Sequence, residues 1–252
     1  MRKLFLSSAL VAGMILMGQA SAQFDPAMGK VFGAYFQVMQ RNPAGLVMVP
    51  GVQKELKMDE EQVKTAQEKI GARAGFGFGK GKGGGGGDFK ERMAKMMEKL
   101  EPLKDTPEDQ LEDKIREAFK EDLEGPMKDL EKILKPEQTK RLLQISRQNA
   151  GVSYLASTDG IKELELKDEQ KTKVKEIYKE LQKDVDELRR SGGGKGGFGL
   201  SPESREKMLS LNKEAKEKAL DALTKEQKEK YKELTGEPFE VKFEFRRPKK
   251  DD

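Results

Sequence analysis

The residue types that most often carry out chemistry in proteins are missing from this chain, which contains no histidine and no cysteine. Nucleophilic sites of the Ser-His or Cys-His kind are therefore excluded, and the commonest zinc ligands are absent. Carboxylates are plentiful, but they alternate with lysines in a way that is typical of a solvated helix face with ion pairs one turn apart. We predict a protein that is not an enzyme and uses no cofactor or resident metal.

A glycine-rich tract over 75–87 satisfies the dinucleotide-binding fingerprint at Gly79, Gly81 and Gly84. No strand is expected before it, and a run of glycines matches such a pattern by chance, so nucleotide binding is not predicted. A second glycine-rich tract covers 192–199. Both tracts are predicted to be flexible loops, because glycine has the largest backbone freedom and no side chain to pack.

A five-residue pattern occurs four times: an apolar residue, two variable positions, and then Glu-Gln. We call it the Glu-Gln motif, and number its occurrences first to fourth along the chain. In the fourth, Thr224 and Gln227 have the spacing of a capping box, in which each residue satisfies the backbone amide of the other. The motifs are therefore predicted to start helices, and the residues concerned are Met58, Asp59 and Gln62, then Leu134 and Gln138, then Leu166 and Gln170, then Leu223, Thr224 and Gln227.

Apolar residues recur at helical spacing after each motif and around both glycine-rich tracts. After the second motif, for example, Leu142 and Ile145 fall on the same face. The order motif, helix, glycine-rich tract, helix and motif occurs in both halves of the chain, which indicates an internal duplication. The first half has an additional helix, expected to begin at Thr106-Pro107 and to carry Leu111 to Leu123 on one face.

The predicted fold is therefore all-α, with amphipathic helical hairpins in two tandem copies. The expected segments are a signal peptide at 1–22, a first copy at 23–149, a second copy at 150–238 and an extended, charged tail at 239–252. Phe239 and Val241 in that tail alternate with charged residues, as in a strand, but no partner strand is evident.

The first residues predict export from the cell. Arg2 and Lys3 precede an apolar run that is too short to span a bilayer, and a small-x-small cleavage site ends at Ala22. We expect cleavage after Ala22 and a periplasmic or extracellular product with no membrane span. Positive and negative residues nearly balance, 49 Lys and Arg against 45 Asp and Glu, so nucleic acid is not an expected partner.

The chain resembles the periplasmic LTxxQ-motif family, of the Spy and CpxP type, through its Glu-Gln motifs. The fourth Glu-Gln motif, residues 223–227, matches the family motif fully, and the first three Glu-Gln motifs match it in part. The resemblance implies small helical proteins that pair as cradle-shaped dimers and hold unfolded clients without ATP, or that damp an envelope stress sensor. Because this chain carries two copies, an intramolecular pair could take the place of a homo-oligomer.

Met93, Met96 and Met97 form an apolar stripe in the first copy. Ordinary packing explains such a stripe, and so does an adaptable surface for varied protein or peptide clients. The sequence thus favours a chaperone-like binding protein. The alternative is a structural or adaptor protein of the cell envelope that binds one specific partner or an anionic polymer. A metal-responsive sensor is less favoured, because histidine and cysteine are missing.

Overall fold

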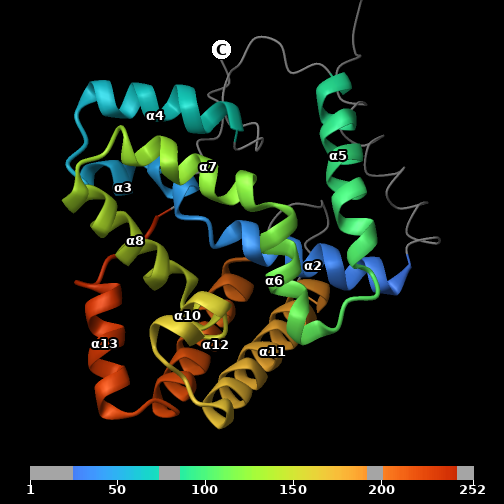
Figure 1. Cartoon of the computed structure of the whole chain (residues 1–252). Coiled ribbons are helices and arrows are strands. Elements are labelled where there is room, and N and C mark those ends of the chain that lie inside the picture. Colours follow the sequence, from blue (N-terminus) through green and yellow to red (C-terminus); the bar gives the residue numbers. More distant parts are fainter. Residues whose placement is uncertain (1–24, 74–85, 192–200, 243–252) are drawn as a thin grey trace, which may run out of the picture. The chain divides into compact units, whose positions relative to one another are not determined.

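The computed structural model of the chain describes residues 25–73, 86–191 and 201–242. Most of these residues are helical and no strand occurs among them, which confirms the all-α class (Figure 1). Contacts divide the chain into two compact units. The first unit contains the described parts of 25–38 and 86–119, and the second contains 39–73, 120–191 and 201–242.

The first unit is built from helices α2 (Pro26–Gln40), α5 (Gly86–Leu100) and α6 (Glu108–Ala118), with the 3₁₀ turn η2 (Glu101–Leu103) between the last two. Phe119 caps the end of α6 and is buried. Its ring centroid lies 4.6 Å from that of Tyr35 on α2, and the Lys99 ammonium lies 4.8 Å above the same ring. Aromatic and cation–π contacts of this kind join the three helices of the unit.

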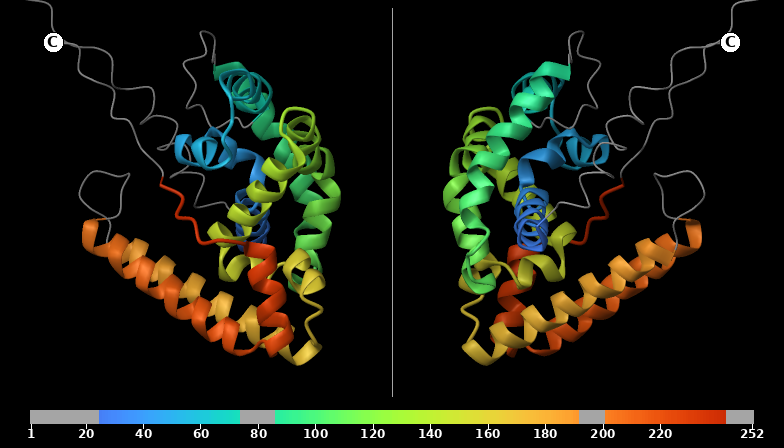
Figure 2. Two further views of the ribbon diagram at one scale, coloured as in Figure 1. Left: turned by 90° about the vertical axis from the view of Figure 1, so that its left-hand side faces the viewer. Right: turned by 90° about the vertical axis from the view of Figure 1, so that its right-hand side faces the viewer.

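The second unit contains ten helical segments among the described residues. They are η1 (Pro43–Met48), α3 (Pro50–Glu55), α4 (Glu60–Arg73), α7 (Lys120–Glu131), α8 (Pro136–Ala150), α9 (Val152–Leu155), α10 (Thr158–Glu163), α11 (Asp168–Ser191), α12 (Pro202–Asp221) and α13 (Lys225–Thr235). The long helices α11 and α12 lie side by side along their length (Figure 2).

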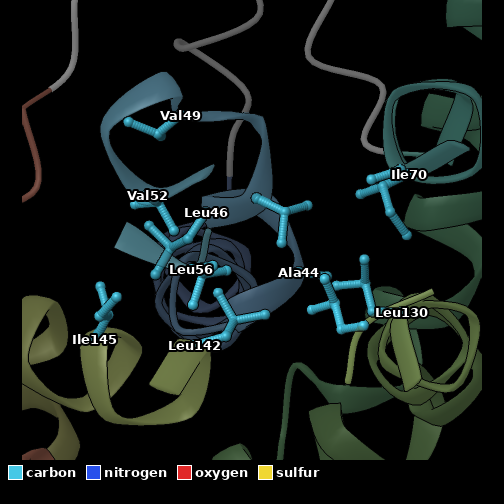
Figure 3. Close-up of a cluster of buried hydrophobic side chains, with 12 residues drawn as sticks. Ala44, Leu46, Val49, Val52, Leu56, Ile70, Leu130, Leu142 and Ile145 are labelled. Atoms are coloured by element: carbon cyan, nitrogen blue, oxygen red, sulfur yellow. The ribbon is translucent and has the colours of Figure 1, made fainter. Parts of the chain in front are cut away.

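A first buried cluster lies between η1, α3, α4, α7 and α8 (Figure 3). It consists of Ala44, Leu46, Val47, Val49, Val52, Leu56, Ala66, Ile70, Leu130, Leu134, Leu142 and Ile145. Leu142 and Ile145 are both completely buried, as their spacing after the second motif predicts. Each side chain of this size contributes about 1.5–3 kcal/mol when fully buried, so the apolar pair fixes the face of α8 that turns inward.

A second buried cluster joins α9, α11, α12 and α13. It consists of Val152, Tyr154, Leu155, Ala156, Leu164, Leu166, Val174, Leu181, Ala215, Ala219, Leu223 and Tyr231. The predicted stripe along α11 is observed: Val174, Leu181 and Leu188 are buried. On α12 the small residues Ala215 and Ala219 are buried, which allows the two helices to approach closely.

The two clusters are built on matching stretches of chain. The short helices α3 and α10 both end in Lys-Glu and are followed by a buried leucine, Leu56 or Leu164. The next residue, Lys57 or Glu165, has a positive φ of 52° in both cases. A left-handed backbone conformation costs a non-glycine residue about 1–2 kcal/mol, so its recurrence before the first and third motifs is a specific feature. Such a correspondence is what an internal duplication would produce.

Two expectations differ from the structure in detail. The additional helix of the first half does not continue to Leu123: α6 ends at Ala118, and Leu123 lies on α7. Thr106 is not its cap, because Pro107 occupies that position without a side-chain hydrogen bond. The predicted boundary between the copies, at 149/150, falls at the end of α8, within the second unit.

Several predicted segments lie outside the described residues. These are the signal peptide at 1–22, the first glycine-rich tract up to residue 85, the second tract at 192–199 and the tail beyond residue 242. The last two glycines of the first tract, Gly86 and Gly87, belong to the start of α5, so that helix begins earlier than expected.

Candidate functional site

The Glu-Gln motifs lie at helix starts, as predicted. Thr224 caps α13: its hydroxyl accepts from the Gln227 N–H at 3.3 Å, and Gln227 Oε1 accepts from the Thr224 N–H at 2.9 Å. Asp59 and Gln62 form the same reciprocal pair before α4, at 2.8 and 3.2 Å. The capping box is therefore confirmed in the fourth motif, and the first motif has it as well.

The second and third motifs have only half of this arrangement. Gln138 Oε1 accepts from the Lys135 N–H at 2.8 Å, and Gln170 Oε1 accepts from the Lys167 N–H at 3.0 Å. A lysine side chain has no acceptor, so it cannot return the bond. The glutamine is consequently the one motif residue that satisfies a helix-start amide in all four Glu-Gln motifs.

The four glutamines are joined in pairs across long stretches of sequence. Gln62 Nε2 donates to Gln138 Oε1 at 2.9 Å, and Gln138 Nε2 donates back at 3.1 Å, although the residues are 76 positions apart. Gln170 and Gln227 form the equivalent pair at 2.8 and 3.1 Å, 57 positions apart. We call these the first and second glutamine pairs. Each ties the start of one helix to the start of another.

The glutamine pairs also hold the backbone of the partner motif. Each side chain donates to the carbonyl just before the apolar residue that leads its partner: Gln62 to Ile133 (2.7 Å), Gln138 to Lys57 (3.3 Å), Gln170 to Ala222 (2.8 Å) and Gln227 to Glu165 (3.4 Å). Gln138 makes a further bond to the Leu56 carbonyl at 2.9 Å. The leading residues Leu134, Leu166 and Leu223 are buried, whereas Met58 is half-buried.

Two arginines on α8 make partly buried ion pairs within the second unit. Arg141 meets Glu55 at 2.7 Å, and Arg147 meets Glu163 at 2.8 Å. Glu163 also accepts from the Tyr154 hydroxyl. Burial raises the pKa of Glu163, but the hydrogen bonds from Arg147 and Tyr154 outweigh it and leave that pKa below its ordinary value. Burial and the neighbouring carboxylate raise the pKa of Tyr154.

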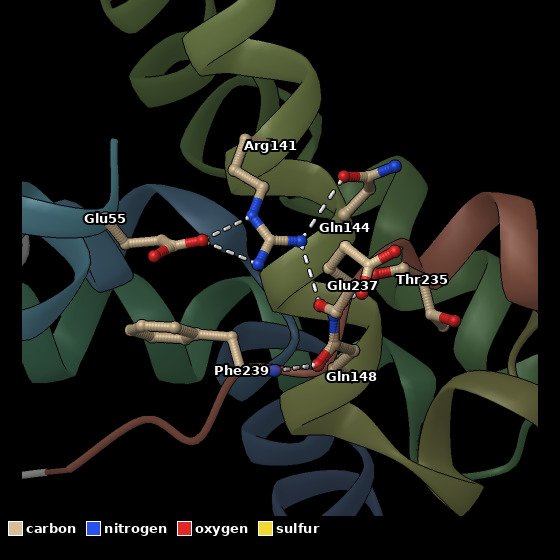
Figure 4. A network of polar contacts seen from close by, with 7 residues as sticks. All are labelled: Glu55, Arg141, Gln144, Gln148, Thr235, Glu237 and Phe239. Atoms are coloured by element: carbon tan, nitrogen blue, oxygen red, sulfur yellow. Dashed lines mark hydrogen bonds and ion pairs between the residues drawn. The ribbon is translucent and has the colours of Figure 1, made fainter. Parts of the chain in front are cut away.

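The tail after α13 is docked on α8 in its described part. Gln148 Nε2 donates to the Glu237 carbonyl at 2.7 Å, and Gln148 Oε1 accepts from the Phe239 N–H at 2.7 Å (Figure 4). Arg141 Nη1 also donates to the Glu237 carbonyl, at 3.0 Å. Phe239 and Val241 pack against the first cluster. The expected extended tail thus has a partner, and that partner is a helix rather than a strand.

An open, polar hollow of about 480 Å³ lies beside this contact. Its lining consists of Glu55, Lys140, Arg141, Gln144, Glu233, Gly236 and Glu237. Acidic and basic groups are mixed in it, and the Arg141 and Glu55 charges already satisfy each other. Three carboxylates against two basic groups leave a formal charge of only −1, so the hollow offers little excess charge for a small ionic ligand.

The methionine stripe lies in the first unit, whereas all four Glu-Gln motifs lie in the second. Met93, Met96 and Met97 are half-buried on α5, and the neighbouring Ala94 and Glu98 are exposed. The stripe is therefore one face of that helix.

Among the described residues, no group of three or more acidic side chains is arranged to hold a metal ion. In the same part of the chain, no helix is long and apolar enough to cross a membrane. Comparison of the chain with protein-family models, with curated proteins and with solved structures gave no match. The resemblance to the LTxxQ-motif family therefore rests on the motifs alone.

Proposed function

We propose that this protein is an exported, ATP-independent binding protein that holds non-native segments of other proteins. The observation that carries the proposal is the face of α5 with Met93, Met96 and Met97, three half-buried side chains on a helix that is rich in charged residues. Methionine is unbranched and polarizable, so a methionine-rich face adapts to partners of varied shape. On α2 of the same unit, Phe36 is 43% exposed and adds aromatic surface.

The second unit would serve as the scaffold in this account. Its glutamine pairs and its two buried clusters hold the helices together. The partial match of its motifs to the LTxxQ-motif family agrees with a holding function.

Light scattering of insulin reduced by dithiothreitol tests the proposal, and the reductant is harmless because this chain has no cysteine. At equimolar concentration the protein should suppress the aggregation of the insulin B chain. The double variant Met93→Gln, Met97→Gln should lose most of the suppression. The matched variant Ala94→Gln, Glu98→Gln has the same spacing on the exposed side of α5 and should retain it.

Absence of suppression by the unaltered protein would refute the holding function. In that case, capture of one saturable partner from envelope extracts would support the adaptor alternative.

A further inference from the structure

Residues 237–242 follow α13 as a non-helical segment whose exposure alternates. Phe239 and Val241 are half-buried, whereas Pro238, Glu240 and Lys242 are exposed. Side chains that alternate between two sides are the mark of an extended backbone. The segment therefore has the exposure pattern of an extended chain, with two apolar side chains packed against the first cluster.

The polar contacts of this segment with α8 go to its main chain. Gln148 uses both ends of its carboxamide, accepting from the Phe239 N–H and donating to the Glu237 carbonyl, each at 2.7 Å. Arg141 reaches that carbonyl at 3.0 Å (Figure 4). The Gln148 side chain thus takes the place that a neighbouring strand would have. Main-chain hydrogen bonds combined with seats for alternate side chains are how proteins bind extended peptides of varied sequence.

We propose that the face of α8 around Arg141 and Gln148 is a binding site for extended peptide segments with apolar residues at alternate positions, and that residues 237–242 are its resting occupant. This site lies in the second unit and adds to the methionine face of α5 in the first. It rests on the proposed function, since non-native proteins expose segments of this kind. The partner requires an aromatic or branched apolar residue, any residue, and a second apolar residue, as in Phe239 and Val241.

The resting occupant makes the site weak toward free peptides. A tethered segment competes at an effective concentration of the order of millimolar for a short linker. The apparent association constant for a free peptide is the intrinsic constant multiplied by the fraction of molecules in which the site is open. Removal of the segment should therefore strengthen binding by about 10-fold or more.

Fluorescence anisotropy with a labelled peptide of residues 236–243 measures this directly. A chain that ends at Gly236 should bind the peptide saturably and at least about 10-fold more tightly than the full chain. In the shortened chain, Gln148→Ala should weaken binding about 30-fold, because two main-chain bonds of about 1 kcal/mol each are lost. Asn149→Ala, an exposed neighbour on α8, should leave it unchanged. A peptide with serine in place of both apolar residues should not bind.

Equal affinity of the full and shortened chains, or binding that does not depend on Gln148, would overturn the proposal. If the shortened chain loses helicity, the full-length double variant Phe239→Ser, Val241→Ser replaces it. That variant must bind the peptide more tightly than the unaltered chain, and failure to do so overturns the proposal. Peptide binding without suppression of insulin aggregation would refute the proposed function alone, whereas suppression without peptide binding would refute only this site.

Discussion

Gln138 is the most deeply buried of the four motif glutamines, with a relative exposure of 6%. Its Oε1 accepts from the Lys135 N–H and from Gln62, and its Nε2 donates to Gln62 and to the Leu56 carbonyl. Gln138→Ala removes these bonds and leaves the Lys135 amide and the Leu56 carbonyl without this partner. A net hydrogen bond is worth about 0.5–1.5 kcal/mol, and a buried group left unsatisfied costs about 1–3 kcal/mol. We expect a loss of about 2–4 kcal/mol in the free energy of unfolding.

Urea unfolding followed by circular dichroism at 222 nm measures this loss. Gln227→Ala removes the equivalent contacts from a half-exposed side chain, so water replaces part of them and the loss should be smaller, about 1–2 kcal/mol. Gln67→Ala on α4 is the control of the same residue type, exposed, and should change stability by less than about 0.5 kcal/mol. A Gln138→Ala loss no larger than that of Gln67→Ala would refute the role of the first glutamine pair.

The variant Gln138→Glu distinguishes the acceptor role of the Gln138 side chain from its donor role. Gln138→Glu keeps an acceptor for the Lys135 N–H but replaces the donor by a carboxylate oxygen that faces the Leu56 carbonyl and Gln62 Oε1. At pH 7 it should cost at least as much as Gln138→Ala, and at a pH low enough to protonate the carboxyl part of the loss should be recovered. Equal losses at both pH values would show that donation by Gln138 is unimportant.

Three further predictions concern single side chains of the second unit. Thr224→Ala removes the hydroxyl that caps α13 and should lower the free energy of unfolding by about 0.5–2 kcal/mol in a urea melt. Client binding measured by titration should not change. Unchanged stability with weaker client binding would make the fourth motif a client contact. Tyr231 has a buried hydroxyl that meets no protein hydrogen-bond partner in the described part of the chain, and burial raises its pKa from 10.0 to about 12. The contribution of the neutral Tyr231 to stability is therefore complete below pH 10.0 and is lost as the pH rises toward about 12. In thermal melts, Tyr231→Phe should be at least as stable as the unaltered protein at pH 7, and it should lose less stability than that protein at pH 11. The pKa of Glu163 lies below its ordinary 4.5 because the hydrogen bonds from Arg147 and Tyr154 outweigh burial. Its ionised form therefore stabilises the fold above pH 4.5, and this contribution is lost as the pH falls through the lower pKa. Glu163→Gln should be less stable at pH 6 and should flatten the acid limb of the stability curve, and an unchanged acid limb would contradict this.

Local signals made much of the second unit predictable from the sequence. The capping box at Thr224 and Gln227 involves residues of one turn, so their spacing alone defines it. The apolar pair Leu142 and Ile145 follows from helical periodicity, and both residues are buried.

Long-range contacts were not predictable in the same way. The spacing of Gln62 and Gln138 explains their bonds to their own helix starts, but nothing local shows that two amides 76 positions apart face each other. A candidate signal existed in the invariance of the glutamine among four motifs whose cap residues differ. The break after α6 was missed as well: Phe119 leaves the helical conformation, with a φ of −113°, and its ring packs against Tyr35, a contact between distant segments.

The tail shows a third limit. Its alternating Phe239 and Val241 predict that one side of the segment is covered, and both are half-buried, yet strand periodicity does not say what covers them. The covering element is α8, whose Gln148 supplies the hydrogen bonds that a strand would supply.

The central claim, that the protein binds non-native chains, is tested most directly with one client in two states. Reduced, carboxymethylated α-lactalbumin is permanently unfolded, and the native form of the same protein is the matched folded state. Isothermal titration in nucleotide-free buffer should show saturable binding of the unfolded form and none of the native form. Equal binding of both forms, or no binding of either, would contradict the account.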